Sequence, residues 1–208
     1  MSDEEIDRKI AVIFATDVVG YSKHMETDES ETVKNLRACE KLLMRLFDRH
    51  KARLFNTGGD SFLAEFPSAV SAIECAVEFQ NAIKERNASD KATVKLEFRI
   101  GINSGDVIKE KGNLLGDGVN IAARLEALAQ TGGITISKGV YDFVKGKTNF
   151  EFNDLGIQKV KQNEFHAFDI LLDENRKRKP KKSININPAK AIMITVVFIL
   201  LVAVSIIV

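Results

Sequence analysis

The sequence has few of the residues from which disulfide frameworks and zinc sites are built. Its 208 residues include two cysteines, Cys39 and Cys75, and three histidines, His24, His50 and His166. The cysteines have no metal-like spacing and both fall in segments with helical periodicity, so we expect reduced thiols and a reducing, cytoplasmic compartment. The histidines are scattered along the chain, which argues against a zinc site.

The chain also lacks the positive charge that a nucleic-acid-binding domain would need. Its formal net charge is +1, but 7 of the 30 basic residues lie at or beyond Arg176 and all 29 acidic residues lie before it. Residues 1–175 are therefore net acidic, and we expect no nucleic-acid partner. The first residues are acidic and polar, so a secretory signal is not predicted.

A basic linker and an apolar run follow this acidic part. Residues 173–188 are polar and basic, and the eighteen residues from Ala191 to Val208 carry no charge. A helix of that length covers roughly 27 Å, near the minimum for a bilayer, and it is apolar on every side. We predict a transmembrane helix over residues 189–208 in a single-pass protein of the cell membrane. The linker would lie against anionic headgroups, with residues 1–172 in the cytoplasm.

Residues 1–172 alternate between strand-like and helical patterns. We predict helices over residues 28–50, 67–86 and 118–130, a short one ending near residue 144, and strands over residues 10–16, 53–56, 62–66, 96–103, 107–110, 134–136, 150–154 and 166–171. A turn at Ser104–Asp106 is expected to separate two of these strands. This order predicts an α+β domain in which helices cover a mainly antiparallel sheet.

Two aspartates lie at the ends of predicted strands. Asp17 comes directly after an apolar strand, and Asp60 lies in the Gly58–Asp60 turn of a predicted β-hairpin. Two carboxylates brought together at strand ends form a site for a hard cation such as Mg²⁺. The alternative is that Asp17 is a helix or turn cap and Asp60 an ordinary turn residue.

A later helix carries an asparagine and an arginine four residues apart. Asn120 and Arg124 fall on one face of the predicted helix, so both side chains can reach a single charged transition state. The alternative is a polar helix face on which Arg124 pairs with Glu126 or Asp117. Taken with the two aspartates, this helix predicts two-metal phosphoryl-transfer chemistry on a nucleotide.

In this order, the motifs in Phe14–Ser22, Gly58–Phe66 and Gly116–Glu126 resemble those of class III nucleotidyl cyclases over roughly residues 8–172. They are most similar to the bacterial branch in which the catalytic domain precedes a membrane segment. The resemblance implies a ferredoxin-like or palm-type fold. It also implies conversion of a nucleoside triphosphate, with ATP expected, to a 3′,5′-cyclic monophosphate and pyrophosphate, for second-messenger signalling.

The resemblance also assigns roles to the motif residues. It implies that Asp17 and Asp60 hold two Mg²⁺ or Mn²⁺ ions, that Asn120 orients the ribose, and that Arg124 stabilises charge on the α-phosphate. It implies a homodimer in which the aspartates of one chain face the Asn/Arg helix of the other. Lys161 occupies the position of a triphosphate-binding lysine in the family. The neighbouring glycine of that pattern is missing, so a solvated surface lysine is the alternative.

The base-recognition positions depart from the family's patterns. Adenylyl cyclases of this type usually carry Lys four residues before the second metal aspartate, and Asp or Thr three residues before the glycine of the Gly-Asp-Gly turn. Asn56 and Asn113 stand there, and guanylyl cyclases commonly use Glu at the first position. Leu115 also replaces the aromatic residue often found before that glycine. Because an Asn amide both donates and accepts hydrogen bonds, it can pair with several bases.

Three alternatives remain open at this point. A cyclase of relaxed or pyrimidine specificity would account for Asn56 and Asn113. A catalytically inactive cyclase homology domain would bind nucleotide or partners without turnover. Finally, Gly58–Phe62 is similar to the signature loop of diguanylate cyclases, although Ser61 stands where that loop needs an acidic residue.

Overall fold

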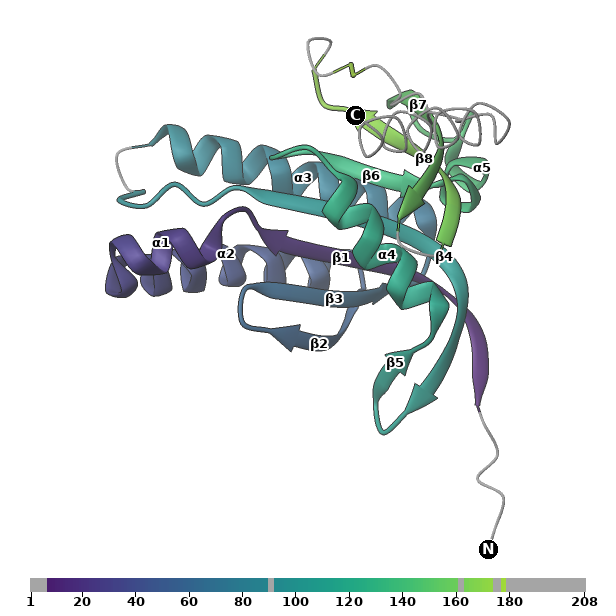
Figure 1. Cartoon of the computed structure of the whole chain (residues 1–208), viewed down its shortest axis with the longest axis horizontal. Helices are drawn as coiled ribbons and strands as arrows, with labels where there is room; N and C mark the ends of the chain where they lie inside the picture. The colour runs from purple at the N-terminus through teal and green to yellow at the C-terminus, as the bar shows by residue number, and fades with distance from the viewer. Residues whose placement is uncertain (1–6, 90–91, 161–162, 174–176, 179–208) are drawn as a thin grey trace, which may run out of the picture.

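The computed structural model describes residues 7–89, 92–160, 163–173 and 177–178. Its centre is an eight-stranded sheet in the order β2-β3-β1-β4-β6-β8-β7, with β5 paired to β4 beside this path (Figure 1). The strands are β1 (Arg8–Val18), β2 (Arg53–Gly58), β3 (Ser61–Phe66), β4 (Phe98–Glu110), β5 (Asn113–Leu115), β6 (Ile134–Ser137), β7 (Glu151–Val160) and β8 (Asn163–Leu171). The β4–β6 pair is parallel and the other pairs are antiparallel, as predicted for an α+β domain.

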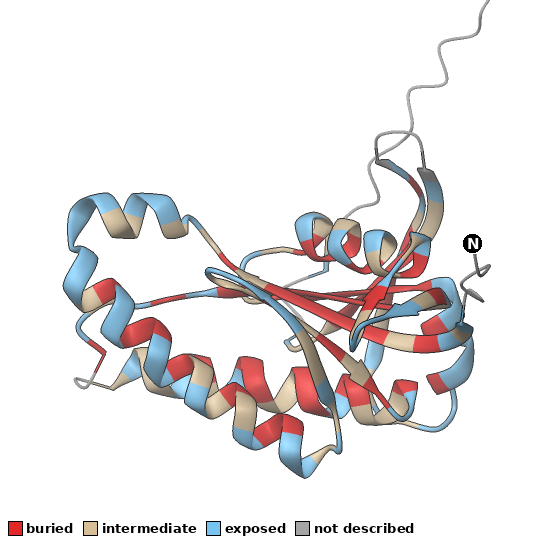
Figure 2. Ribbon diagram, turned by 90° about the horizontal axis from the view of Figure 1, so that it is seen from below, coloured by how far each residue is buried: buried red, intermediate tan, exposed pale blue. Residues whose placement is uncertain are grey.

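Helices cover both faces of the sheet. They are α1 (Tyr21–Thr27), α2 (Glu29–Arg49), α3 (Ala69–Ala88), α4 (Asp117–Leu128) and α5 (Lys138–Val144). The larger core lies between the sheet and α2, α3 and α5, and a smaller one lies under α4, which crosses in front of β1 and β4 in Figure 1. Buried residues concentrate on the sheet and on the helix sides that face it (Figure 2).

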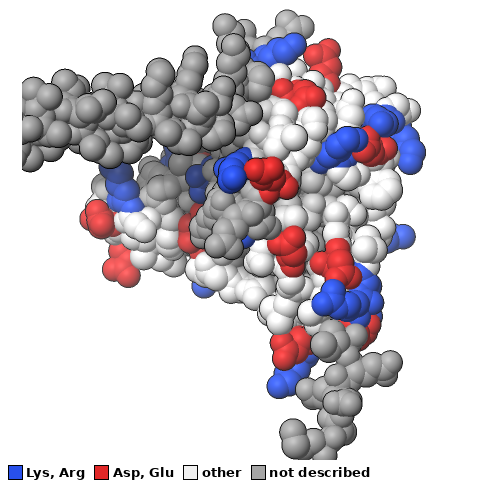
Figure 3. All heavy atoms as spheres, turned by 45° about the vertical axis from the view of Figure 1, so that its right-hand side comes forward, with Lys and Arg blue, Asp and Glu red and all other residues white. Residues whose placement is uncertain are grey.

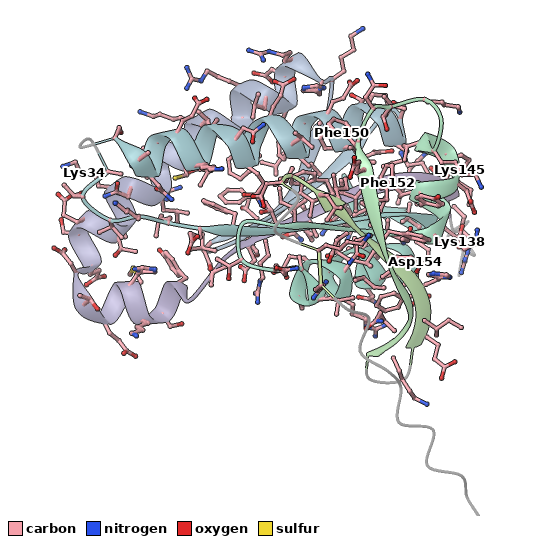
Figure 4. The ribbon with its side chains drawn as sticks, turned by 90° about the horizontal axis from the view of Figure 1, so that it is seen from above. Lys34, Lys138, Lys145, Phe150, Phe152 and Asp154 are labelled. Carbon is pink, nitrogen blue, oxygen red and sulfur yellow. The ribbon has the colours of Figure 1, made fainter. Side chains whose placement is uncertain are left out.

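The larger core is built from aromatic rings that meet edge to face. The Phe14 and Phe47 ring centroids lie 5.5 Å apart, and those of Phe47 and Phe66 lie 5.7 Å apart, which ties β1, α2 and β3 together. At the other end, Tyr141 of α5 stacks on Phe168 of β8 at 4.1 Å. Figure 4 shows the α5–β7 end of the domain, with labelled side chains from both elements.

The predicted turn at Ser104–Asp106 is wrong, because these residues continue β4 without interruption. Asp106 pairs with Ile10 and Ser104 with Val12 of β1, so pairing across the sheet overrides the local preference for a turn. The chain instead turns at Lys111 and Gly112, both with positive φ, and enters the short strand β5. Helix α1 and strand β5 were also not predicted.

The end of the chain is described in part. Among the residues that the structure describes, no helix is both long enough and apolar enough to cross a membrane. The helix predicted over residues 189–208 lies outside the described residues, as does most of the predicted linker. Within the linker, Arg178 returns to the domain, where its Nε donates to Asp169 Oδ2 at 2.6 Å and its Nη1 to the Leu128 carbonyl oxygen at 3.0 Å.

Candidate active site

Strand pairing brings Asp17 and Asp60 together. Asp17 lies near the end of β1, and Asp60 follows Gly59 in the turn between β2 and β3. Gly59 has a φ of 68°, a conformation that glycine adopts without strain. Because Thr16 pairs with Phe62 of β3, this turn lies alongside Asp17. Burial raises the pKa of Asp17, and the neighbouring Asp60 carboxylate raises it further.

The raised pKa has a chemical consequence. Two carboxylates held side by side repel one another, and a bound divalent cation relieves that repulsion. Oxygen donors are also the ligands that Mg²⁺ and Mn²⁺ prefer. The chemistry of Asp17 and Asp60 therefore fits a divalent cation, which both carboxylates could bind.

An ion pair that was not identified from the sequence, Arg99 with Glu126, borders these aspartates. Arg99 of β4 lies opposite Asp17 in the strand register, with its Nη2 3.5 Å from Asp17 Oδ2. Its Nε donates to Glu126 Oε1 of α4 at 2.8 Å. Glu126 therefore pairs with Arg99 and not with Arg124, the partner considered as an alternative from the sequence. One sequence signal was available, namely an arginine between Phe98 and Ile100, two apolar residues of the predicted strand.

Helix α4 lies unusually close to the sheet. A Cβ atom added to Gly101 of β4 would lie 2.1 Å from the Glu126 nitrogen and 2.2 Å from the Ala122 oxygen. One added to Gly118 of α4 would lie 2.7 Å from the Asp106 oxygen. Glycines on both elements thus allow backbone to approach backbone, and this contact sets the position of α4.

Asn120 and Arg124 lie one turn apart on α4 but differ in exposure. Asn120 is exposed, and the side chain of Arg124 is 22% exposed. Arg124 Nη1 is buried and has no hydrogen-bond partner among the described residues, but it forms a long ion pair with Asp117 Oδ1 at 4.0 Å, the pairing given above as the alternative. A buried, unsatisfied guanidinium nitrogen is costly, so this atom is suited to an anionic ligand.

The direction of α4 shows where Asn120 and Arg124 lie relative to Asp17 and Asp60. Helix α4 runs antiparallel to β4, with Gly118 beside Gly105 and Glu126 beside Gly101. The aspartates border the Glu126 end, and Asn120 lies six residues earlier, about 9 Å along the helix axis. Asn120 is exposed and lies away from the aspartates, whereas Arg124 is only two residues from Glu126.

The predicted base-recognition residues lie on neighbouring elements. Asn56 is exposed on β2 and Asn113 is half-buried on β5, and Arg53 of β2 joins the two elements by donating to the Gly112 oxygen at 2.6 Å. The Asn113 side-chain oxygen accepts a hydrogen bond from the Leu114 N–H at 2.8 Å. Lys161, the predicted triphosphate ligand, lies outside the described residues.

Charges of both signs cover the surface around these elements. Acidic and basic side chains are interspersed over the face drawn in Figure 3. Many of them form exposed pairs, such as Lys109 with Asp7 and Lys138 with Asp142.

Sequence comparisons relate this arrangement to known proteins. The family described as "Adenylate and Guanylate cyclase catalytic domain" matches residues 3–173. "Putative adenylate cyclase 3" of Rhizobium meliloti is 44% identical over 165 residues, 79% of this chain and 28% of that protein. An "Adenylate cyclase" of Streptomyces coelicolor is 34% identical over 128 residues, 61% of this chain and 32% of that protein. The chain thus spans about a third or less of these relatives.

Solved structures share the fold. A crystal structure titled adenylate/guanylate cyclase/hydrolase, from Silicibacter pomeroyi, superposes with a TM-score of 0.74 at 33% identity, over 81% of this chain and 100% of that one. An adenylyl cyclase from P. aeruginosa superposes with a TM-score of 0.71 over 84% of this chain and 99% of that one. Its 22% identity supports the fold alone.

Proposed function

The chain belongs to the adenylate and guanylate cyclase catalytic-domain family, and on that premise we propose that it converts a nucleoside triphosphate, with ATP as the expected substrate, into the 3′,5′-cyclic monophosphate and pyrophosphate. The observation that carries the proposal is the adjacency of Asp17 and Asp60: burial raises the pKa of Asp17, and repulsion by Asp60 raises it further. Such a pair has a clear use in binding the divalent cations on which phosphoryl transfer depends.

Asp17 and Asp60 are the residues that would hold two Mg²⁺ or Mn²⁺ ions. When bound, such ions neutralise triphosphate charge and lower the pKa of a nearby hydroxyl. Arg99 lies beside the pair as a permanent cation, within 3.5 Å of Asp17. A carboxylate pair bordered by an arginine favours the polyphosphate end of a nucleotide.

Asn120 and Arg124 would act on the reacting groups. An asparagine amide can orient a ribose hydroxyl, and an arginine can stabilise the charge that develops on the α-phosphate. The buried Nη1 of Arg124, with no hydrogen-bond partner among the described residues, supports this role. Arg124→Ala is expected to lower kcat far more than it raises KM for the nucleotide.

A homodimer would assemble the complete site. Because Asn120 lies away from the aspartates in one chain, a head-to-tail dimer could place the Asn120/Arg124 pair of one chain opposite the aspartates of the other, giving two shared sites. The test mixes two inactive variants, Asp60→Asn and Arg124→Ala. Random exchange makes half of the dimers mixed, each with one intact site, so about a quarter of the wild-type activity should return. No recovery would reject shared sites.

Relaxed or pyrimidine specificity is a second candidate, and Asn113 favours it. Its side-chain oxygen is engaged by the Leu114 N–H, which leaves the amide N–H groups to meet a base. The adenine amino group needs an acceptor, whereas a base carbonyl accepts from N–H.

Turnover of ATP, GTP, CTP and UTP, each with Mn²⁺ or Mg²⁺, decides between these candidates. Cyclic AMP alone supports the ATP proposal, and a pyrimidine product or a mixture supports the second. No product from any of the four at high protein concentration would favour an inactive nucleotide-binding domain.

We also propose a tether to the cell membrane, with the catalytic domain in the cytoplasm. The uncharged residues 191–208 and the basic block before them support it. Fractionation tests the tether, because recovery of the full chain in the soluble fraction without detergent would contradict it.

A further inference from the structure

Arg99 is shared unequally between two carboxylates. Its Nε lies 2.8 Å from Glu126 Oε1, a normal hydrogen bond, and its Nη2 lies 3.5 Å from Asp17 Oδ2, at the limit of one. The guanidinium is therefore bound to α4 and only borders the aspartate pair. This asymmetry is unexpected, because Arg99 and Asp17 face each other on paired strands.

Glu126 is fixed in place and lies beside the pair without belonging to it. It is 8% exposed, and its backbone nitrogen lies against Gly101, where the helix meets the sheet. Burial raises its pKa, and the Asp17 and Asp60 charges add to that effect, so Glu126 lies within their field. Among the described residues, no group of three acidic, histidine or cysteine side chains has an arrangement that could hold a metal ion. Its hydrogen bond to Arg99, which in turn borders Asp17, connects Glu126 to the pair.

An arginine beside a metal site competes with the metal. The guanidinium is always charged and can bind a carboxylate with two parallel N–H groups. If Arg99 bound Asp17 in this way, a divalent cation would have to displace it. Glu126 prevents this arrangement because it takes the Nε–H and leaves only Nη2 near Asp17.

We propose that Glu126 is a positioning residue, which holds Arg99 off Asp17 and so keeps that carboxylate open to a divalent cation. The inference rests on the proposed function, in which Asp17 and Asp60 are the metal ligands. It adds a residue from the helix that carries Asn120 and Arg124.

The test measures Mn²⁺ binding by electron paramagnetic resonance, on the full chain in detergent and without nucleotide. In Glu126→Gln the side chain keeps its shape, but a neutral amide cannot compete with Asp17 for the guanidinium. We expect Mn²⁺ affinity to fall about tenfold or more, the range for partners that orient metal ligands. Glu110→Gln removes one exposed acid from the far end of β4 and should leave the affinity within about twofold of the wild type.

Repeating the Glu126→Gln substitution in a protein that lacks Arg99 separates this positioning role from a direct charge effect on the metal. In Arg99→Met there is no guanidinium to hold, so adding Glu126→Gln should change Mn²⁺ affinity less than about twofold. An equal loss in both backgrounds would show that Glu126 acts through space and would overturn the proposal. Unchanged affinity in Glu126→Gln alone would overturn it as well.

The proposed function fails in a distinguishable way. If wild type and Asp60→Asn bind Mn²⁺ equally, the metal assignment itself is wrong, whatever Glu126 does. Thermal unfolding of each variant checks that it is folded. If Arg99→Met does not fold, Arg99→Gln, which keeps a polar group for Glu126, takes its place in the same comparison.

Discussion

Replacing Gly101 with alanine should separate helix α4 from the sheet. The new Cβ would lie 2.1 Å from the Glu126 nitrogen and 2.2 Å from the Ala122 oxygen, whereas ordinary contact begins at 3.4 Å. Both obstacles are backbone atoms, so no side chain can rotate away, and α4 must move outward by more than about 1 Å. That movement loosens the packing of Leu125, which is fully buried. Overpacking costs about 1–3 kcal/mol, and here we expect about 3 kcal/mol.

Urea unfolding of the full chain, followed by circular dichroism, measures this cost. With a slope of about 1–3 kcal/mol per molar, the midpoint of Gly101→Ala should fall by about 1 M or more. Gly139→Ala is the matched control, because its Cβ would meet Ser104 and Ser137 atoms at 3.7 and 3.9 Å. Gly139 lies in α5, where alanine is the better helix former, so the control should be neutral or more stable by up to about 1 kcal/mol.

A result opposite to this would refute the reasoning about α4. If the Gly101→Ala midpoint stays within about 0.3 M of the wild type, helix position does not depend on this close approach. The same variant should lose cyclase activity, because a shift of about 1 Å at α4 displaces Asn120 and Arg124. Full activity together with a lowered midpoint would show that the substitution destabilises the fold without displacing Asn120 and Arg124.

Three further predictions test other parts of the structure. Arg178→Met leaves the buried Asp169 without its cation, so we expect the unfolding free energy measured by urea titration to fall by about 3 kcal/mol. The control is Lys177→Met at the exposed neighbouring position, which should change that free energy by less than about 0.5 kcal/mol. Burial raises the pKa of Cys75 to about 12, so about one thiol in ten thousand is ionised at pH 8, and a disulfide reagent should label it only after denaturant is added. Asp60→Asn removes a charge that repels Asp17, so in metal-free buffer the melting temperature of this variant should rise by about 2 °C. Added Mg²⁺ should no longer stabilise the variant, and retained stabilisation by Mg²⁺ would contradict the metal assignment.

The fold was predictable where local patterns and tertiary packing agree. Helix α2 buries residues at helical spacing and is capped by Asp28, whose side chain accepts from the Glu31 N–H, so its pattern and its cap point to one element. The Ser104–Asp106 segment shows the opposite case. Its composition favours a turn, but strand β1 pairs with all three of its residues, and the continuous strand results.

The candidate site was predictable to the extent that it depends on strand ends. Asp17 and Asp60 could be expected to meet because each adjoins a strand of one small sheet. Arg99 and Glu126 could not be paired from the sequence, since they are 27 residues apart and their contact depends on strand register and helix direction together. Lys161 stays a prediction, as does the role of each residue in turnover.

The glycines show why sequence alone is least informative about helix position. Gly101 and Gly105 look alike in the sequence, and a glycine in a strand pattern is compatible with a turn, a bulge or a close approach. In the structure both lie under α4, and the helix touches the sheet through its backbone. One rigid element therefore fixes Glu126 beside the aspartates at one end and Asn120 toward the other. A change in this packing must act on both halves of the proposed site at once, which a substitution confined to either half cannot do.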